Sequence, residues 1–122
     1  MRLKLAAGLI ALAGFGGFTA LSANYWLAPK RTVDSLIQAA PTFWDVDEVW
    51  RQRAAEMLPI GLPDREVERR LAKAGFEVGT ASNGAQLSQP VGSCWVGLTA
   101  SWRLDDERRL IALTSNARAA CI

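Results

Sequence analysis

The chain has 122 residues, of which 50% are hydrophobic and 21% are charged, and its formal net charge is +2. This length fits one small domain with a terminal segment, and the apolar fraction is too high for a disordered chain. The balance of charges argues against a nucleic-acid partner. Because the chain has no histidine and only 2 cysteines, a four-ligand zinc cage and a histidine-dependent catalytic triad are excluded. We therefore expect no catalytic residues, no metal site and no cofactor.

The N-terminal segment has the pattern of a membrane-spanning helix. Residues 5–23 carry no charge and follow a basic N-terminus. At a helical rise of about 1.5 Å per residue they span about 28 Å, close to the hydrocarbon thickness of a bilayer. Tyr25 and Trp26 come directly afterwards, and both residue types prefer the membrane interface. We predict that residues 1–24 form a membrane anchor that contacts the lipid bilayer through residues 5–23.

A secretory signal peptide, cleaved after Ser22 or Ala23, is the alternative for this segment. The full spanning length of residues 5–23 favours a retained anchor instead. The basic N-terminus favours a cytoplasmic start, which predicts a single-pass protein of the bacterial inner membrane with a periplasmic C-terminal domain. Small residues at four-residue spacing would let another membrane helix approach closely, and they are candidate partner contacts: Ala13, Gly16, Gly17 and Ala20.

The first helix after this segment is predicted over residues 32–40. Pro29 should end any helix before it, Thr32 can act as the N-cap, and Pro41 stops the helix. Its apolar residues recur at helical spacing: Val33, Leu36, Ile37 and Ala40.

A second helix is predicted between Thr42 and Pro59. Thr42 and Asp45 have the spacing of a capping box. The apolar stripe of this helix consists of Phe43, Val46, Trp50, Ala54 and Met57. Trp44 and Trp50 are candidate contacts with a partner protein or with the membrane surface, although packing in the core is the default interpretation of both.

A third helix is predicted over residues 64–74, between Pro63 and Gly75. A short strand should follow at residues 76–78. Residues 81–93 have little apolar content and are predicted to form a loop. Basic residues of the third helix alternate with acidic ones, so we interpret them as a solvated face rather than an anion site: Arg65, Arg69, Arg70 and Lys73.

The last thirty residues predict a β-hairpin. Residues 94–104 alternate strictly between apolar and polar side chains, as in a strand with one buried face. An acidic turn follows, and the returning strand begins at Leu110, with Ile111 and Leu113 as the inward pair. Trp95 is expected to point outward and is the third candidate partner contact.

The two cysteines lie at matching positions of this hairpin. If Cys94 faces Cys121, Trp102 faces Leu113 and Asp105 faces Leu110, which leaves a short loop of acceptable length. A disulfide is then expected in an oxidising compartment. Two free buried thiols are the alternative.

These elements predict an α+β protein. An N-terminal transmembrane or signal helix should precede two to three short helices and a C-terminal antiparallel β-hairpin or small sheet. We divide the chain into an anchor or signal segment (1–24), a helical connector (25–59) and a small exported domain (60–122).

Several short motifs occur together in the C-terminal half: Leu58-Pro59-Ile60-Gly61, Val67, Leu71, Gly75-Phe76 and Trp102-Arg103-Leu104-Asp105. Over residues 58–122 this pattern resembles the BamE-type (SmpA/OmlA-like) outer-membrane assembly factors and the related modules of β-lactamase inhibitor protein. The resemblance implies a small envelope domain that binds proteins without catalysis, and it transfers no specific binding residues. The chain departs from the BamE type because no lipid-bearing cysteine follows its apolar segment.

We expect a non-catalytic, membrane-anchored protein with an exported domain. It would act as an accessory, scaffold or assembly subunit of an envelope or inner-membrane complex, with other membrane or envelope proteins as partners. The alternative is a secreted binder or inhibitor of another protein, with a cleaved signal peptide. Its contacts would lie on the exposed side of the hairpin: Trp95, Thr99, Ser101 and Arg103.

Overall fold

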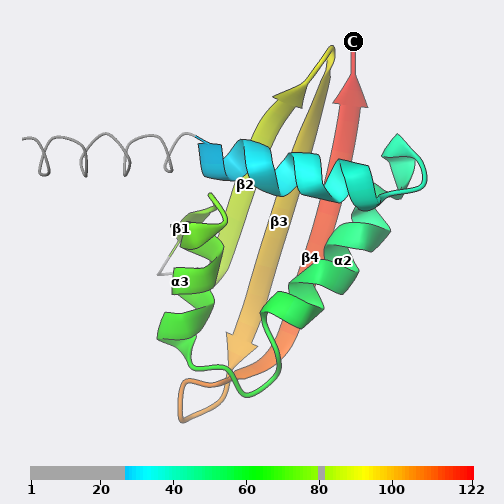
Figure 1. Cartoon of the computed structure of the whole chain (residues 1–122). Helices are drawn as coiled ribbons and strands as arrows, with labels where there is room; N and C mark the ends of the chain where they lie inside the picture. Colours follow the sequence, from blue (N-terminus) through cyan, green and yellow to red (C-terminus); the bar gives the residue numbers. More distant parts are fainter. Residues whose placement is uncertain (1–26, 80–81) are drawn as a thin grey trace, which may run out of the picture.

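The computed structural model describes residues 27–79 and 82–122. They form a four-stranded antiparallel sheet in the order β1-β2-β3-β4, with helices on one of its faces (Figure 1). The strands are β1 (Glu77–Gly79), β2 (Gly84–Val91), β3 (Cys94–Leu104) and β4 (Leu110–Cys121). The helical layer consists of an N-terminal helix (residues 27–39), the 3-10 turn η1 (Phe43–Asp45), α2 (Val46–Met57) and α3 (Asp64–Lys73). The predicted α+β class is confirmed.

The predicted membrane anchor, residues 5–23, lies outside the described residues, as does the prediction that Tyr25 and Trp26 lie at the membrane interface. The candidate contacts of that segment lie outside them too: Ala13, Gly16, Gly17 and Ala20. Within residues 27–79 and 82–122, no helix is both long enough and apolar enough to cross a membrane.

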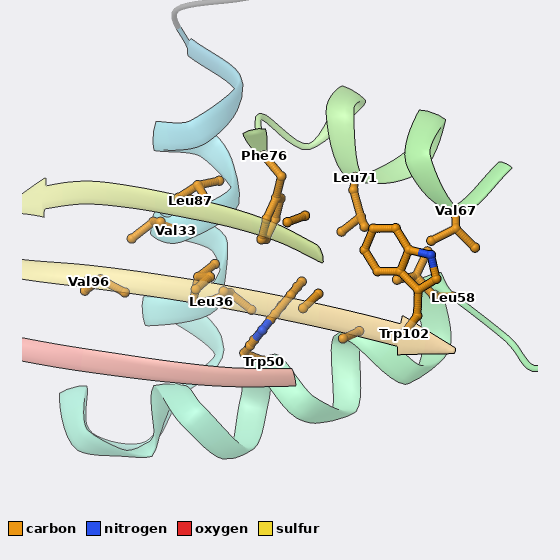
Figure 2. Close-up of a cluster of buried hydrophobic side chains, with 14 of the residues drawn as sticks. Val33, Leu36, Trp50, Leu58, Val67, Leu71, Phe76, Leu87, Val96 and Trp102 are labelled. Atoms are coloured by element: carbon orange, nitrogen blue, oxygen red, sulfur yellow. The ribbon is translucent and has the colours of Figure 1, made fainter. Parts of the chain in front are cut away.

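The hydrophobic core lies between the helical layer and the inner face of the sheet (Figure 2). β3 supplies its centre, because every second side chain of this strand is buried: Val96, Leu98, Ala100 and Trp102. The helices contribute residues at helical spacing, among them Val33, Leu36, Trp50, Ala54, Leu58, Val67 and Leu71. The described part of the predicted connector, residues 27–59, therefore packs on the sheet and shares its core.

The N-terminal helix differs from the prediction at its start. Residues 27–39 are helical, so Pro29 does not end a helix and Thr32 is not an N-cap. The Thr32 hydroxyl instead donates a hydrogen bond to the Ala74 carbonyl oxygen at 2.6 Å, which ties this helix to the end of α3. Gly75 permits the contact, since a Cβ atom there would lie 2.5 Å from the Pro29 nitrogen.

α2 and α3 lie close to their predicted positions. The Asp45 carboxylate accepts hydrogen bonds from the Thr42 backbone N–H (3.0 Å) and hydroxyl (2.7 Å), as their spacing predicts. Gly75 follows α3 with a φ of +97°, a backbone conformation that favours glycine. The buried positions of both helices agree with the predicted stripes: Val46, Trp50 and Ala54 in α2, and Val67 and Leu71 in α3.

The prediction of a loop over residues 81–93 is wrong, because this segment contains β2. Ala85 and Leu87 are buried against the helices and pair with β3, while polar side chains alternate with them. Pro90 is compatible with a strand here because β1 pairs only with residues 84–86. Among the described strands, none therefore lies beside Pro90 on the β1 side. The N–H that proline lacks would have no strand to donate to there.

The hairpin of β3 and β4 has the predicted register over most of its length. Cys94 pairs with Cys121 and Trp102 pairs with Leu113. The two cysteines form a disulfide bond. The inner face of β3 was therefore predictable from its alternation, and the disulfide follows from the same register.

A β-bulge beside the turn of the hairpin changes the pairing there. Leu104, rather than Asp105, pairs with Leu110, so Ile111 is the extra residue of β4. The shift reverses which side chain points inward: Leu110 is fully buried, and Ile111 is 47% exposed. The prediction that Ile111 points into the core is therefore wrong.

A buried carboxylate fixes α3 to the turn end of the hairpin. Asp64, the first residue of α3, is only 7% exposed. Its carboxylate accepts hydrogen bonds from the Trp102 indole at 3.4 Å and from the Arg108 guanidinium at 2.6 Å. The Asp64 backbone N–H also donates to the Arg108 carbonyl oxygen at 3.0 Å. These contacts hold the end of β3 against the helical layer.

Candidate functional site

The outer face of the sheet carries the candidate functional site, because the described helices all cover the inner face (Figure 1). In β3 the buried side chains alternate with exposed ones, and four of the latter are Trp95, Thr99, Ser101 and Arg103. These are the residues predicted for the exposed side of the hairpin. We call the outer side of β1 to β4 the open face.

Small polar side chains occupy the middle of the open face. The register places Thr99 between Gln86 of β2 and Asn116 of β4. It also places Ser101 beside Thr114, and all five side chains are exposed. The Thr99 hydroxyl donates to the Asn116 carbonyl oxygen at 3.4 Å. The middle of the face therefore offers hydroxyl and amide groups that can donate and accept hydrogen bonds to a ligand backbone.

Trp95 lies at one end of this polar surface. It is 53% exposed and pairs with Pro90 on one side and Ala120 on the other. The neighbouring disulfide, Cys94–Cys121, joins β3 covalently to β4. Trp95 is therefore a large exposed side chain on a backbone that is restrained on both sides, and tryptophan is enriched among the residues that contribute most to protein interfaces.

The charges of the open face are unevenly distributed. Arg103 lies at the end opposite to Trp95, and Arg118 pairs with Gly97 in the row next to Trp95. On the described outer side of β2, β3 and β4, these two arginines are charged and no residue is acidic. The acidic side chain of the open face, Glu77, lies on β1.

A shallow hollow marks the β1 side of the open face. Its volume is about 480 Å³, and its lining includes Glu77, Gly79, Gly84, Gln86 and Thr99. Two of these residues are glycines, and the Ser82 hydroxyl lies over them, 2.7 Å from the position that a Cβ atom of Gly79 would take. Within the described residues there is no cluster of three or more histidine, cysteine or acidic residues that could hold a metal ion.

Trp50 is placed differently from the prediction of a partner contact. It is 1% exposed, stacks on Phe76 at 5.2 Å between ring centroids, and donates a hydrogen bond from its indole to the Thr99 carbonyl oxygen at 3.0 Å. Trp50 therefore supports β3 from behind and is not available to a partner. Trp44 is 69% exposed but lies in η1, on the helical side of the molecule.

Two basic residues of α3, Arg69 and Arg70, already have partners within the protein. Glu66 forms ion pairs with Arg69 and, at 3.2 Å, with Arg70. Arg70 also donates to the Met57 carbonyl oxygen at 2.7 Å. Hydrogen bonds from Arg69 and Arg70 lower the pKa of Glu66 to about 2 from its ordinary value of 4.5. Because both arginines already have partners, these contacts favour the interpretation of a solvated helix face.

Comparison of the chain with protein-family models, curated proteins and solved structures found no match. The resemblance to BamE-type domains over residues 58–122 therefore stays a prediction.

Proposed function

We propose that this protein is a non-catalytic, membrane-anchored subunit of an envelope or inner-membrane complex, whose exported domain binds a partner protein through the open face. The observation that carries the proposal is the open face itself. It joins an exposed tryptophan, Trp95, to a row of hydrogen-bonding side chains on a rigid sheet. Tryptophan and arginine are enriched among the residues that contribute most to protein interfaces.

Two further observations support an exported domain held at a membrane. The cysteines at positions 94 and 121 are bonded to each other, and such bonds persist in oxidising compartments outside the cytoplasm. Residues 5–23 form an uncharged sequence of spanning length. A retained anchor would keep the domain at the membrane surface, where other envelope proteins are its neighbours.

Co-purification tests this proposal. The full chain, tagged at its C-terminus, is extracted from membranes of its host in a gentle detergent, and the retained proteins are identified by mass spectrometry. We expect one or more membrane or envelope proteins in stoichiometric amounts, and a bait whose intact mass still includes residues 1–24. Trp95→Ala should weaken binding of the partner about thirtyfold and reduce its recovery accordingly, since loss of an interface anchor costs on the order of 2 kcal/mol.

Trp44→Ala is the matched control, because Trp44 is more exposed than Trp95 but lies on the helical side. Its partner recovery should equal that of the unchanged protein. Equal losses for both variants, or no loss for either, would contradict binding through the open face.

The second candidate function is a secreted binder or inhibitor that uses the same face. It is favoured by the exposure of Trp95, Thr99, Ser101 and Arg103 on one side of the hairpin. The same experiment separates the two candidates. A bait that begins near Ala23 and is found only in the soluble fraction would support the secreted protein and exclude the anchored subunit.

A further inference from the structure

The outer edge of β4 is a second surface with unused binding capacity. β4 is 12 residues long and is the last strand of the sheet, so one of its sides has no neighbouring strand in the described structure. An edge strand exposes unpaired backbone N–H and C=O groups unless something covers them. This surface adjoins the open face at Thr114 and Asn116. It uses the outward backbone groups of β4, so binding at this edge does not depend on the proposed function.

One hydrogen bond shows which backbone groups point outward. The Ala117 N–H donates to the Asp47 carboxylate of α2 at 2.7 Å, so this amide points away from β3. Backbone groups in an antiparallel ladder alternate in direction, and the register is regular over this part of β4. The N–H and C=O groups of Leu113 and Ser115 therefore also point outward.

α2 closes the edge at one end and leaves it open beyond. Asp47, Arg51 and Ala55 follow one another at helical spacing along the side of α2 next to β4. Asp47 occupies the amide of Ala117, whereas Arg51 and Ala55 border a groove of about 530 Å³. The groove is also lined by Leu58, Ile60 and residues 113–116 of β4.

The lining of the groove determines what can occupy it. Ile60 and Leu113 present apolar surface, and Ile60 is 67% exposed, whereas Leu58 lies beneath them and is 1% exposed. Of the described residues that line the groove, Arg51 is charged and none is acidic. Its guanidinium pairs with the Asp47 carboxylate of the same helix at 3.0 Å, but its side chain is 58% exposed and keeps N–H donors for a second carboxylate. An extended backbone is the group that matches outward N–H and C=O groups at alternate positions. Apolar side chains would match the walls, and a carboxylate would match Arg51.

We propose that an extended segment of a partner protein adds to the sheet as a fifth strand, paired with residues 113–116 of β4 in the groove beside α2. Its inward side chains are aliphatic, and it carries a carboxylate near Arg51. Asp47 marks the end of the site, because it already holds the next outward amide.

A peptide titration tests this proposal with the full chain, labelled with nitrogen-15 and held in detergent. The probe is a short acetylated peptide of alternating valine and threonine with one central glutamate. We expect its addition to shift the amide resonances of Leu113 and Ser115 and to slow their hydrogen exchange. Replacing the glutamate of the probe by lysine, or methylating the backbone nitrogens on one of its edges, should weaken binding.

Two variants of the protein locate the site. Ser115→Pro removes an outward N–H that makes no bond to β3, so the sheet should remain folded while binding weakens about tenfold, the effect of one lost hydrogen bond with its desolvation. Ala55→Arg fills the groove from an exposed position of α2. Gln52→Arg, also at an exposed position of α2 but outside the groove lining, is the control and should bind the probe like the unchanged protein.

Three outcomes would overturn the proposal. The first is no resonance shift in β4 at the highest soluble concentration of the peptide. The second is binding that neither Ser115→Pro nor Ala55→Arg weakens. The third is a dimer in light scattering that Ser115→Pro dissociates, since a second copy of the chain would then occupy the edge.

Discussion

Gly75 shows how one residue joins two helices of this protein. It ends α3 with a φ of +97°, and it also lies against Pro29 of the N-terminal helix. Two requirements therefore meet at one position: a left-handed backbone and the absence of a side chain. The first is visible in the sequence as a helix followed by glycine. The second depends on packing between distant segments and is not.

Gly75→Ala should therefore destabilise the protein by more than the backbone strain alone. Gly61 provides the matched control, because its φ is +94° and a Cβ atom there would have no neighbour within 4 Å. We expect Gly61→Ala to lower the free energy of unfolding by about 1 kcal/mol, and Gly75→Ala to lower it by at least about twice as much. Urea unfolding measures both values. Equal losses would show that the contact with Pro29 contributes nothing.

The ion pairs of Glu66 predict a pH dependence. Its pKa in the folded protein is about 2, below the ordinary value of 4.5, so its contribution to stability is present above pH 4.5 and is lost as the pH falls toward 2. In urea unfolding, Glu66→Gln should lower stability at neutral pH, and the difference from the unchanged protein should shrink below pH 4.5. Glu68→Gln, on the same helix, is the control. A difference that stays constant down to pH 2 would contradict this assignment.

At the scale of elements, the sequence was most informative where alternation is strict. Every second side chain of β3 is apolar from Val96 to Trp102, and this pattern predicted the strand, its buried face and its pairing with β4. β2 was missed because glutamine, serine and Pro90 obscure the alternation of Ala85 and Leu87. β2 forms a strand because it pairs with β3 along its whole length. Pro90 is tolerated in it because β1 pairs only with residues 84–86.

The strand pairing beside the hairpin turn is less predictable from the sequence for a related reason. Hydrophobicity alone does not distinguish Leu110 from Ile111 as the inward residue, because both are aliphatic neighbours. The bulge that selects Leu110 accompanies backbone bonds between the hairpin and the segment before α3: Gly61 N–H to the Leu110 carbonyl oxygen at 2.8 Å, and Leu110 N–H to the Leu62 carbonyl oxygen at 2.9 Å. Such long-range pairs leave no local signal in the sequence.

The candidate site, like the strands, is only partly predictable from the sequence. The exposed side of β3, with Trp95, follows from alternation. The hollow over Gly79 and Gly84 could not be found without β2. Trp50 was ambiguous in the sequence, since it belongs both to the apolar stripe of its helix and to the exposed aromatic residues expected at an interface. Its burial behind Thr99 decides for the core.

The disulfide at the end of β3 and β4 predicts a redox-dependent stability. Cys94 and Cys121 are 27 positions apart in the sequence. Closing a loop of this size is worth about 3 kcal/mol in the chain-entropy account. Cys94→Ser should lower the urea midpoint of the protein under oxidising conditions and should leave it nearly unchanged when a reductant is present. An equal loss under both conditions would mean that the side chain matters through packing alone.

The two sides of the sheet have different roles in this protein. The inner side is filled by helices and holds the core, with Trp50 and Trp102 among its largest side chains. The outer side remains open and carries Trp95, two arginines and a row of hydroxyl and amide groups. A partner that binds the open face would cover the second side of the sheet and complete a three-layer arrangement.

Site-specific photo-crosslinking in intact host cells tests whether a partner protein covers the open face. A photoreactive amino acid is placed at Thr99, in the middle of the open face, or at Gln52, an exposed position of α2 in the helical layer. Binding through the open face predicts a discrete crosslinked product with one membrane or envelope protein from position 99. This product should be lost in the Trp95→Ala background and absent from position 52. Crosslinking to that protein from position 52 alone, or from both positions with equal yield, would contradict binding through the open face.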